Sequence, residues 1–402
     1  SALEAHEPDE ASRALAPLAD DPDAAVQLRV AQLHLRNGDK AGALRAAQLA
    51  QDNASTDDDK HSAAALIAFA QEPEPHDDTA MKTLQIAYDL LRENKDDDAL
   101  AAFRQGFAAG AGNAGNYADA AYAAKRLGKN DEAEDLFRQS LDADDKEHAF
   151  DEQRRFGYRR EVQQLERTWG FVLSVPYQVS AFTPQGTVNV LQPGIEAYWQ
   201  PPKIGYQNGR ILQLFVRGYG TAYDGSGNVT GMPTVQGSVG ARYKPIADQN
   251  LVITAERLVR IGRFSTNDWL ARLGYSSEAG SDLRVTQPSW RSWQVYAEAD
   301  YFLHQGRYVL YSELRYGHTW AIPAISDHLT AYPHVAFVFD HDNRETNETA
   351  MGVGPGVQFR FWFRESRYSA PASWTDVTVQ YRFRLTSAAR ARGVVVQATL
   401  WY

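Results

Sequence analysis

The last eleven residues of the chain, Arg392–Tyr402, read RGVVVQATLWY. Apolar residues recur there at every second position, which is the pattern of a β-strand with one apolar face. A chain end is usually polar and frayed, because nothing beyond it holds the backbone in place. The sequence therefore predicts a packed terminal strand, with five residues on its apolar face: Val394, Val396, Ala398, Leu400 and Tyr402.

The same two-residue period runs back from the terminus to Trp169. It is clear in TDVTVQYRFRL (Thr375–Leu385), in VQFRFWFR (Val357–Arg364) and in QVYAEADYF (Gln294–Phe302). We count about twelve such segments of roughly ten residues, separated by clusters of Gly, Pro, Asn and Asp. This half of the chain is therefore predicted to be antiparallel β-structure.

Alternation alone fits two architectures, a soluble sandwich with an apolar core and a membrane barrel with an apolar outside. Three observations favour the barrel. The segments are longer than the strands usual in soluble sheets, and no helical segment is interleaved to cover a sheet. Aromatic residues also recur at the segment ends, as in an interfacial girdle: Trp199, Trp269, Trp293, Trp320, Tyr275 and Tyr402.

A closed barrel gives the terminal strand a role. It would pair with the first strand, around WGFVLSVPYQV (Trp169–Val179), and leave no open sheet edge. The terminal aromatic residue also resembles the C-terminal signature by which Gram-negative outer-membrane proteins are recognised for insertion. The predicted fold is a transmembrane antiparallel β-barrel of about 12 strands.

No membrane-spanning helix is predicted, because the longest apolar run, Ala63–Ala70, has only eight residues. The chain also begins without the basic and apolar segments of a signal peptide. It is therefore expected either to need no export signal or to be a mature or trimmed form.

The composition changes near Arg167. Residues 1–167 hold 20 Lys and Arg against 34 Asp and Glu, whereas the remainder holds 21 against 17. All nine Trp lie between Trp169 and Trp401. We therefore predict two domains, an α-helical domain at 1–167 and the barrel at 168–402. Neither half carries the basic surface that nucleic-acid binding requires.

The helical half contains an internal repeat. AYDLLRENKDDDALAAFRQGF and AYAAKRLGKNDEAEDLFRQSL match at an offset of 34 residues, which pairs Ala87 with Ala121 and Phe103 with Phe137. This period is typical of tetratricopeptide helix pairs, although plain helical bundles share the pattern of Ala and aromatic positions. LHLRNGDKAGALRAAQLA (Leu33–Ala50) is expected to form a third pair, out of register with the others.

No catalytic chemistry is predicted, and we expect neither an enzyme nor a cofactor or metal site. Cys is absent, and no HExxH, GxSxG, P-loop or Rossmann glycine pattern occurs. GVGPGV (Gly352–Val357) has a Pro where a phosphate loop needs a free amide, so we expect a β-bend. His341 lies between Asp340 and Asp342, in what we expect to be an ordinary polar loop.

Function is expected to lie in the lumen of the barrel. The alternation places thirteen charged residues on the inward face: Arg217, Arg242, Lys244, Glu256, Arg272, Glu298, Asp300, Glu313, Arg315, Arg360, Arg364, Arg382 and Arg384. Charges of both signs commonly pair and close a narrow barrel. A twelve-stranded barrel lies between filled barrels and open pores, so the sequence leaves a plugged and a conducting lumen equally open.

Three long stretches resemble the C-terminal domain of the NfrA family, outer-membrane adsorption proteins that serve as receptors for a bacteriophage. They are RYKPIADQNLVITAERLVRIG (Arg242–Gly262), NDWLARLGYSSEAGSDLR (Asn267–Arg284) and FWFRESRYSAPASWTDVTVQYRFRL (Phe361–Leu385). The resemblance extends over roughly residues 187–402. Family members carry tetratricopeptide-like helices before this domain. This chain differs in its short helical region and missing signal peptide, which suggests a trimmed form or a compact homologue.

The resemblance implies an outer-membrane barrel with its helical domain in the periplasm, linked to exopolysaccharide production and to an inner-membrane glycosyltransferase. In that hypothesis the polymer crosses the lumen and stacks on four aromatic residues: Tyr296, Tyr311, Trp362 and Trp401. The alternative is a surface scaffold with a plugged barrel, whose exposed loops serve as a phage receptor.

Overall fold

The computed structural model describes residues 21–71, 78–179 and 189–402, and the chain divides into two compact units, residues 1–79 and 80–402. The first unit contains three described helices, α2 (Ala24–Arg36), α3 (Lys40–Asn53) and α4 (Asp57–Gln71). Helices α2 and α3 form the helix pair predicted between Leu33 and Ala50. Small residues such as Ala31 and Ala47 are fully buried where these helices meet.

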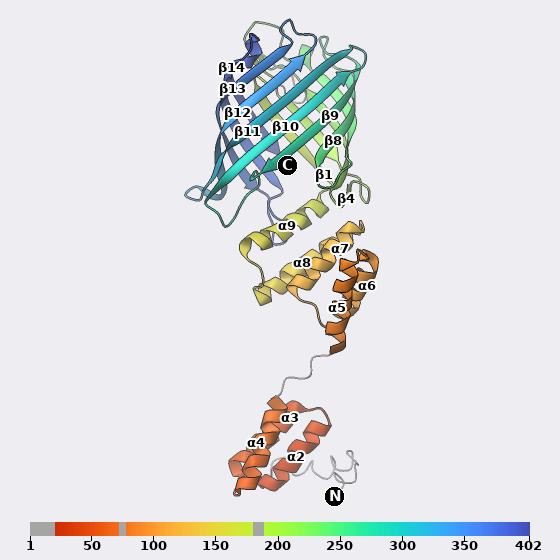
Figure 1. Ribbon diagram of the computed structural model, residues 1–402, viewed down its shortest axis with the longest axis vertical. Coiled ribbons are helices and arrows are strands. Elements are labelled where there is room, and N and C mark those ends of the chain that lie inside the picture. The colour runs from red at the N-terminus through yellow and green to blue at the C-terminus, as the bar shows by residue number, and fades with distance from the viewer. Residues whose placement is uncertain (1–20, 72–77, 180–188) are drawn as a thin grey trace. The chain divides into compact units, whose positions relative to one another are not determined.

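The second unit begins with five described helices (Figure 1). They are α5 (Asp78–Arg92), α6 (Asp96–Ala108), α7 (Ala114–Arg126), α8 (Asn130–Glu147) and α9 (Glu152–Glu166). Two of them, α7 and α9, follow a residue whose side chain accepts a backbone hydrogen bond, as the Asp151 carboxylate does from the Arg154 N–H at the start of α9.

The 34-residue repeat is visible in the packing of α5 to α8. Tyr88 meets Phe103 edge to face with the ring centroids 5.3 Å apart, and Tyr122 meets Phe137 in the same way at 5.0 Å. Both phenylalanines are fully buried. Equivalent residues thus make equivalent contacts in two successive helix pairs, which confirms the tetratricopeptide-like expectation.

From Trp169 onward the described chain is a single antiparallel sheet built on twelve long strands. They are β1 (Trp169–Tyr177), β3 (Gly194–Trp199), β5 (Arg210–Tyr219), β7 (Gln236–Lys244), β8 (Asn250–Arg260), β9 (Asp268–Ala279), β10 (Ser289–Phe302), β11 (Arg307–Ile322), β12 (Ser326–Asp342), β13 (Thr349–Phe363), β14 (Ser373–Arg384) and β15 (Gly393–Trp401). The short strands β2 (Val190–Leu191), β4 (Tyr206–Gln207) and β6 (Tyr223–Asp224) and the 3₁₀ turns η2 (Met232–Thr234) and η3 (Ala389–Ala391) lie in the connections.

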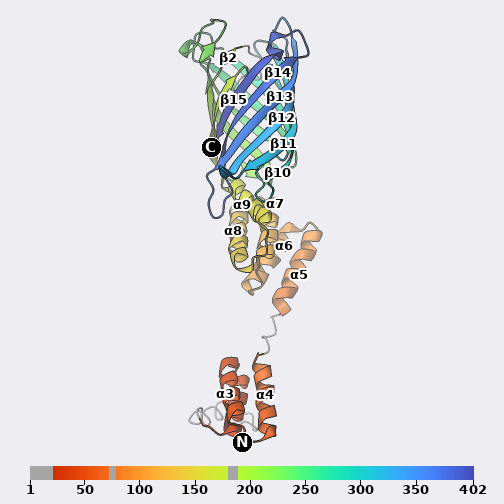
Figure 2. The ribbon, with the colours of Figure 1, turned by 90° about the vertical axis from the view of Figure 1, so that its left-hand side faces the viewer.

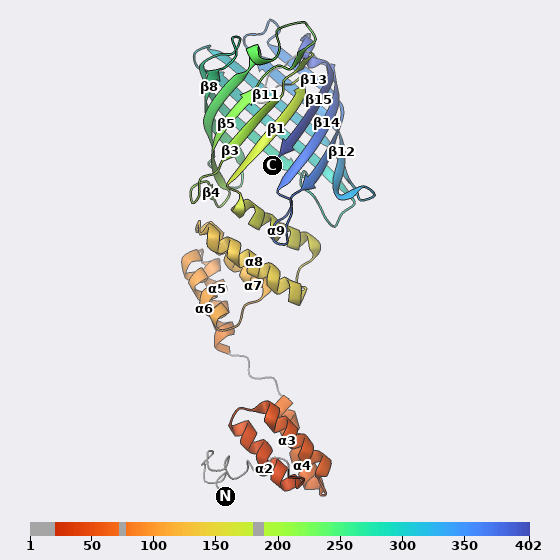
Figure 3. The ribbon, with the colours of Figure 1, turned by 180° about the vertical axis from the view of Figure 1, so that it is seen from behind.

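The sheet closes on itself because β15 pairs with β1, as the terminal alternation predicted (Figure 3). The ladder runs from Val172 opposite Trp401 to Tyr177 opposite Val396. The Tyr402 N–H donates to the Phe171 carbonyl at 2.9 Å, and the Tyr402 carbonyl accepts from the Phe171 N–H at 3.0 Å. Figure 2 shows β10 to β15 in chain order along one side of the wall. The predicted twelve-stranded barrel is therefore confirmed.

The outside of the barrel is apolar. Large hydrophobic side chains on alternate strand positions are widely exposed there: Leu173, Val216, Val239, Ile253, Leu273, Leu314, Val335, Phe359 and Val379. An apolar outer face is suited to lipid, where a closed ring satisfies every backbone group. None of the described helices is long and apolar enough to cross a bilayer.

The Gly352–Val357 segment differs from its expectation, because it continues β13 without a bend. Its glycines allow groups of the neighbouring strands to lie close to the β13 backbone. A Cβ on Gly354 would lie 1.8 Å from the Tyr381 carbonyl oxygen, and one on Gly356 would lie 2.7 Å from the His334 ring. His341 likewise lies within β12 on the outer face, stacked on Tyr308 with the ring centroids 5.5 Å apart.

The change from helix to strand is abrupt, since α9 ends at Glu166 and β1 begins at Trp169. Figures 1 and 3 show α9 lying across the end of the barrel where β1 begins, which we call the helix end. The opposite end is called the far end. The helical core continues into the barrel, because Tyr206 of β4 is buried in the same cluster as Phe137 and Leu165.

Candidate functional site in the barrel lumen

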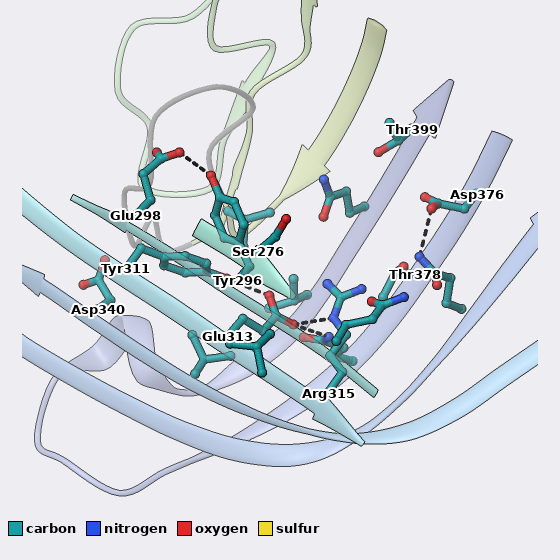
Figure 4. Close-up of a pocket in the computed structure, with 18 of the residues that line it drawn as sticks. Ser276, Tyr296, Glu298, Tyr311, Glu313, Arg315, Asp340, Asp376, Thr378 and Thr399 are labelled. Carbon is teal, nitrogen blue, oxygen red and sulfur yellow. Dashed lines mark hydrogen bonds and ion pairs between the residues drawn. The ribbon is translucent and has the colours of Figure 1, made fainter. Parts of the chain in front are cut away.

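The lumen contains a cavity of about 500 Å³ that is lined by polar side chains from most of the long strands. Figure 4 shows Tyr296, Tyr311, Glu313, Arg315 and Asp376 reaching into it. A second cavity, of about 460 Å³, adjoins it towards α9. Seven residues line both cavities: Arg217, Arg242, Arg272, Ser276, Tyr296, Glu298 and Trp401.

Part of the lumenal wall, formed by β3, β5, β7 and β8, carries a buried ion-pair network. Arg217 lies 2.6 Å from Glu196 and 3.0 Å from Glu256. Arg242 adds a second cation 2.8 Å from Glu196. Glu256 is completely buried and Glu196 is nearly so. Because these charges are removed from bulk water, each depends on its partners.

Arg272 on β9 extends this network to β10. Its guanidinium lies 3.0 Å from Asp300 and 3.6 Å from both Glu256 and Glu298. Three carboxylates surround one guanidinium, so the interaction is mainly electrostatic. The network thus links six neighbouring strands of the wall, from β3 to β10, across the lumenal surface.

The opposite wall carries two further groups. Glu313 accepts from Arg315 at 2.7 Å and from the Gln380 amide at 2.7 Å. Arg360 pairs with Asp376 at 2.9 Å and lies over the Trp374 ring, 4.3 Å from its centroid. These pairs hold the lumenal arginines against the wall.

Two lumenal tyrosines are fixed by adjacent carboxylates. The Tyr311 hydroxyl donates to Glu313 at 2.8 Å, and the Tyr296 hydroxyl donates to Glu298. The two rings lie 6.2 Å apart. Tyr296 remains 39% exposed although it faces inward, which indicates a lumen wide enough for water or a ligand at this level.

At the far end, the connection between β14 and β15 folds into the lumen. Arg390 of η3 reaches Asp340, and its guanidinium donates to the carbonyls of Asn347 and Glu348, both at 2.6 Å. Ala388 and Ala391 are buried beside it. This turn narrows the far end of the cavity.

At the helix end, α9 is held by the β9–β10 and β13–β14 turns. Arg159 pairs with Glu365 at 2.7 Å, and Arg160 contacts Asp282 and donates to the Pro371 carbonyl at 2.9 Å. These charged contacts surround an apolar one, in which Phe156 is buried with Leu283, Trp362 and Ala370.

Helix α8 adds contacts outside the membrane-spanning strands. Arg367 lies 2.7 Å from Asp142 and 2.8 Å from Asp145. The hydrogen bonds from Arg367 and Arg155 hold the pKa of the Asp145 carboxyl below its ordinary value. The last helices and the barrel are therefore joined through both charged and apolar contacts.

Most of the charged residues predicted from the alternation meet in these networks. Nine of them line the two cavities: Arg217, Arg242, Lys244, Arg272, Glu298, Glu313, Arg315, Arg360 and Arg382. Glu256 and Asp300 also face inward, but they are buried beside Arg272 and line neither cavity. Lys244 is the last residue of β7, where it donates to the Ala247 carbonyl at 2.9 Å.

Three predicted residues lie elsewhere. Arg364 follows the end of β13 with a left-handed φ of 66°, and it stacks on the Tyr402 ring outside both cavities. Arg384 is exposed at the far end of β14 and does not line either cavity. Trp362 faces inward but is only 3% exposed beneath α9, so it offers no face to a sugar. Tyr296, Tyr311 and Trp401 do line the lumen.

Several lumenal residues were not predicted from the sequence. Glu196 and Asp376 follow the same two-residue alternation, which was a sufficient signal for them. Trp374 also alternates inward and stacks on Trp401, with the ring centroids 5.9 Å apart. Arg390 lies in a connection, where the strand period gives no information.

Residues 227–398 match the family model described as bacteriophage N adsorption protein A C-term. This match confirms the resemblance to the NfrA family over the region from η2 to β15. No curated protein matches the chain.

Solved structures show only weak likeness. The outer-membrane protein OmpT of Vibrio cholerae is 8% identical, with 59% of this chain and 97% of that chain covered and a TM-score of 0.21. A kinesin light chain with TPR-like repeats from Podosopora anserina is 14% identical over 41% of this chain and 80% of its own, with a TM-score of 0.18. The fold therefore rests on the strand pairing and helix packing above, which are those of an outer-membrane-type barrel preceded by helical repeats.

Proposed function

We propose that this chain is a component of exopolysaccharide secretion or surface assembly in the cell outer membrane, with its helical domain in the periplasm. The observation that carries the proposal is a lumen with a polar cavity and exposed aromatic faces inside an apolar barrel. Hydroxyl-rich chains need such polar surroundings, and aromatic rings give their sugar units a flat surface for stacking.

Three aromatic residues are the candidates for contact with the polymer. Tyr296 and Tyr311 present their rings to the cavity while their hydroxyls are held by carboxylates. Trp401 lines both cavities. Because these rings are fixed by the wall, little side-chain entropy would be lost when a sugar stacks on them.

The helical domain is proposed to recruit an inner-membrane glycosyltransferase or another polysaccharide synthase. Stacked helix pairs present extended surfaces that commonly bind other proteins. The acidic excess of residues 1–167 favours a partner with a basic surface. We propose no catalytic step and no cofactor for the chain itself.

A second candidate function is a non-conducting surface scaffold that a phage adhesin binds at the exposed loops. The ion pairs along the lumen, the Arg390 turn at the far end and α9 at the helix end all favour this reading. The name of the matched family, an adsorption protein, also supports the phage interaction.

The experiment that separates these functions is secretion by a host that lacks the protein. We expect surface polymer to be lost and to return with the unaltered chain. Tyr296→Ala should restore it several-fold less well, because it removes a lumenal stacking face. Tyr301→Ala is the matched control, since Tyr301 lies on the same strand but is 49% exposed on the outer face. Unchanged polymer in the deletion host would eliminate the secretion role and leave the scaffold.

A further inference from the structure

A cleft of about 690 Å³ lies between the helical repeats and the helix end of the barrel. One wall is formed by α7 and α9 and includes Gln153, Arg154 and Gly157. The other is formed by the end of β9 and the following turn and includes Glu278, Asp282 and Arg284. The volume is in the range of about 300–1,000 Å³ that is usual for ligand sites.

The cleft adjoins the lumen at one residue. Glu278 lies on the inward face of β9, opposite Gln294 of β10. It lines the lumenal cavity of about 500 Å³ as well as the cleft. Its side chain is exposed, unlike the buried lumenal carboxylates further along the barrel. The cleft and the lumen therefore meet at the edge of the barrel wall.

The axial approach to the lumen is obstructed, in contrast. Gln163, Gln164 and Arg167 of the α9 segment line the end of the second cavity. Arg167 is itself fixed, because it donates to the Tyr198 hydroxyl at 2.9 Å and to the Ala372 carbonyl at 2.6 Å. A chain moving along the barrel axis would have to displace this segment.

The lining of the cleft fits a hydrated ligand. Among its apolar members, Phe156 and Tyr158 are only 6% exposed and Leu283 only 2%, so they present little surface to the cleft. The open part carries charges of both signs, of which Arg160 and Asp282 pair with each other. Mixed charges and amides bind hydroxyl-rich chains through hydrogen bonds, and they disfavour apolar ligands.

We propose that this cleft is the helix-end entrance of the lumen, through which a hydrophilic, hydroxyl-rich polymer enters from the side, between α9 and the β9–β10 turn. The inference rests on the proposed function, because it gives the route by which the secreted chain reaches the lumen. Gly157 lies in the α9 wall of this entrance and faces open space. A Cβ built on Gly157 would meet no atom within 4 Å apart from its immediate surroundings in the helix.

The test uses the full chain, which contains no native Cys. Gly157→Cys, in planar lipid bilayers, should show steady conductance that falls several-fold when a bulky water-soluble maleimide is added to the helix side. Arg284→Cys, on the opposite wall of the cleft, should be blocked in the same way. Glu152→Cys is the control, because Glu152 is exposed on α9 but does not line the cleft.

Each outcome decides the proposal. Block at both cleft positions but not at the control supports a lateral entrance. Steady conductance that survives complete labelling of both cleft positions overturns the entrance and leaves the secretion role intact. A silent unlabelled protein overturns the entrance together with a conducting role for the barrel.

Discussion

Replacing Val379 by Arg should lower the free energy of unfolding of the barrel by about 2–4 kcal/mol, the cost of a cation near the middle of the lipid-facing wall. Val379 lies in the centre of β14 and is 40% exposed on the outer face. Urea titration in lipid vesicles, followed by the heat-modifiable gel shift of the folded barrel, measures the loss.

The matched control is Gln397→Arg. Gln397 pairs with Thr378, next to Val379 along the ladder, but it faces the lumen and lines the cavity. An added cation there meets water and lumenal carboxylates. The free energy of unfolding should therefore fall by less than about 1 kcal/mol, as for exposed charges elsewhere. Equal losses for the two variants would contradict the assignment of the two faces.

Glu256→Ala should destabilise the barrel by about 3–5 kcal/mol, since it leaves buried cations without their counter-charge. Glu256 is fully buried, and its carboxylate lies 3.0 Å from Arg217 and 3.6 Å from Arg272. The same urea titration measures this change. Few single substitutions in the lumen should have a larger effect.

A double variant that removes both Glu256 and Arg217 distinguishes the loss of charge pairing from the loss of side-chain packing. The double variant Glu256→Ala with Arg217→Ala should recover part of the stability, because fewer unpaired charges remain. Glu132→Ala provides a contrast, since Glu132 pairs with Arg104 on the exposed helical surface and should cost no more than about 1 kcal/mol. If the double variant loses as much free energy of unfolding as the two single variants lose together, or more, charge pairing would be contradicted.

The sequence was sufficient for the features that depend on local periodicity. The two-residue alternation predicted the barrel, because lipid and lumen impose opposite polarity on neighbouring residues of every strand. The offset between Phe103 and Phe137 predicted the helix pairs, because equivalent positions fill equivalent spaces. The terminal strand predicted the closure with β1.

Features that depend on distant contacts could not be predicted in this way. Trp362 obeys the alternation, yet α9 covers it, and α9 lies about 200 residues earlier in the chain. Arg364 would face inward if β13 continued, but the strand ends at Phe363. Arg390 enters the lumen from a connection. Alternation gives the direction of a strand side chain only while the strand lasts.

The central claim is that the two faces of the wall meet different solvents, and a pair of single-Cys variants tests it directly. Phe361 is 37% exposed on the outer face and Tyr296 is 39% exposed on the inner face. The two side chains therefore lie on opposite faces of the wall but have nearly the same exposed fraction. In lipid vesicles, Phe361→Cys should react with a lipid-soluble maleimide and resist a charged, water-soluble one. Tyr296→Cys should show the reverse preference. Shielding of Phe361→Cys from both reagents, or its reaction with the charged reagent, would contradict a lipid-facing wall.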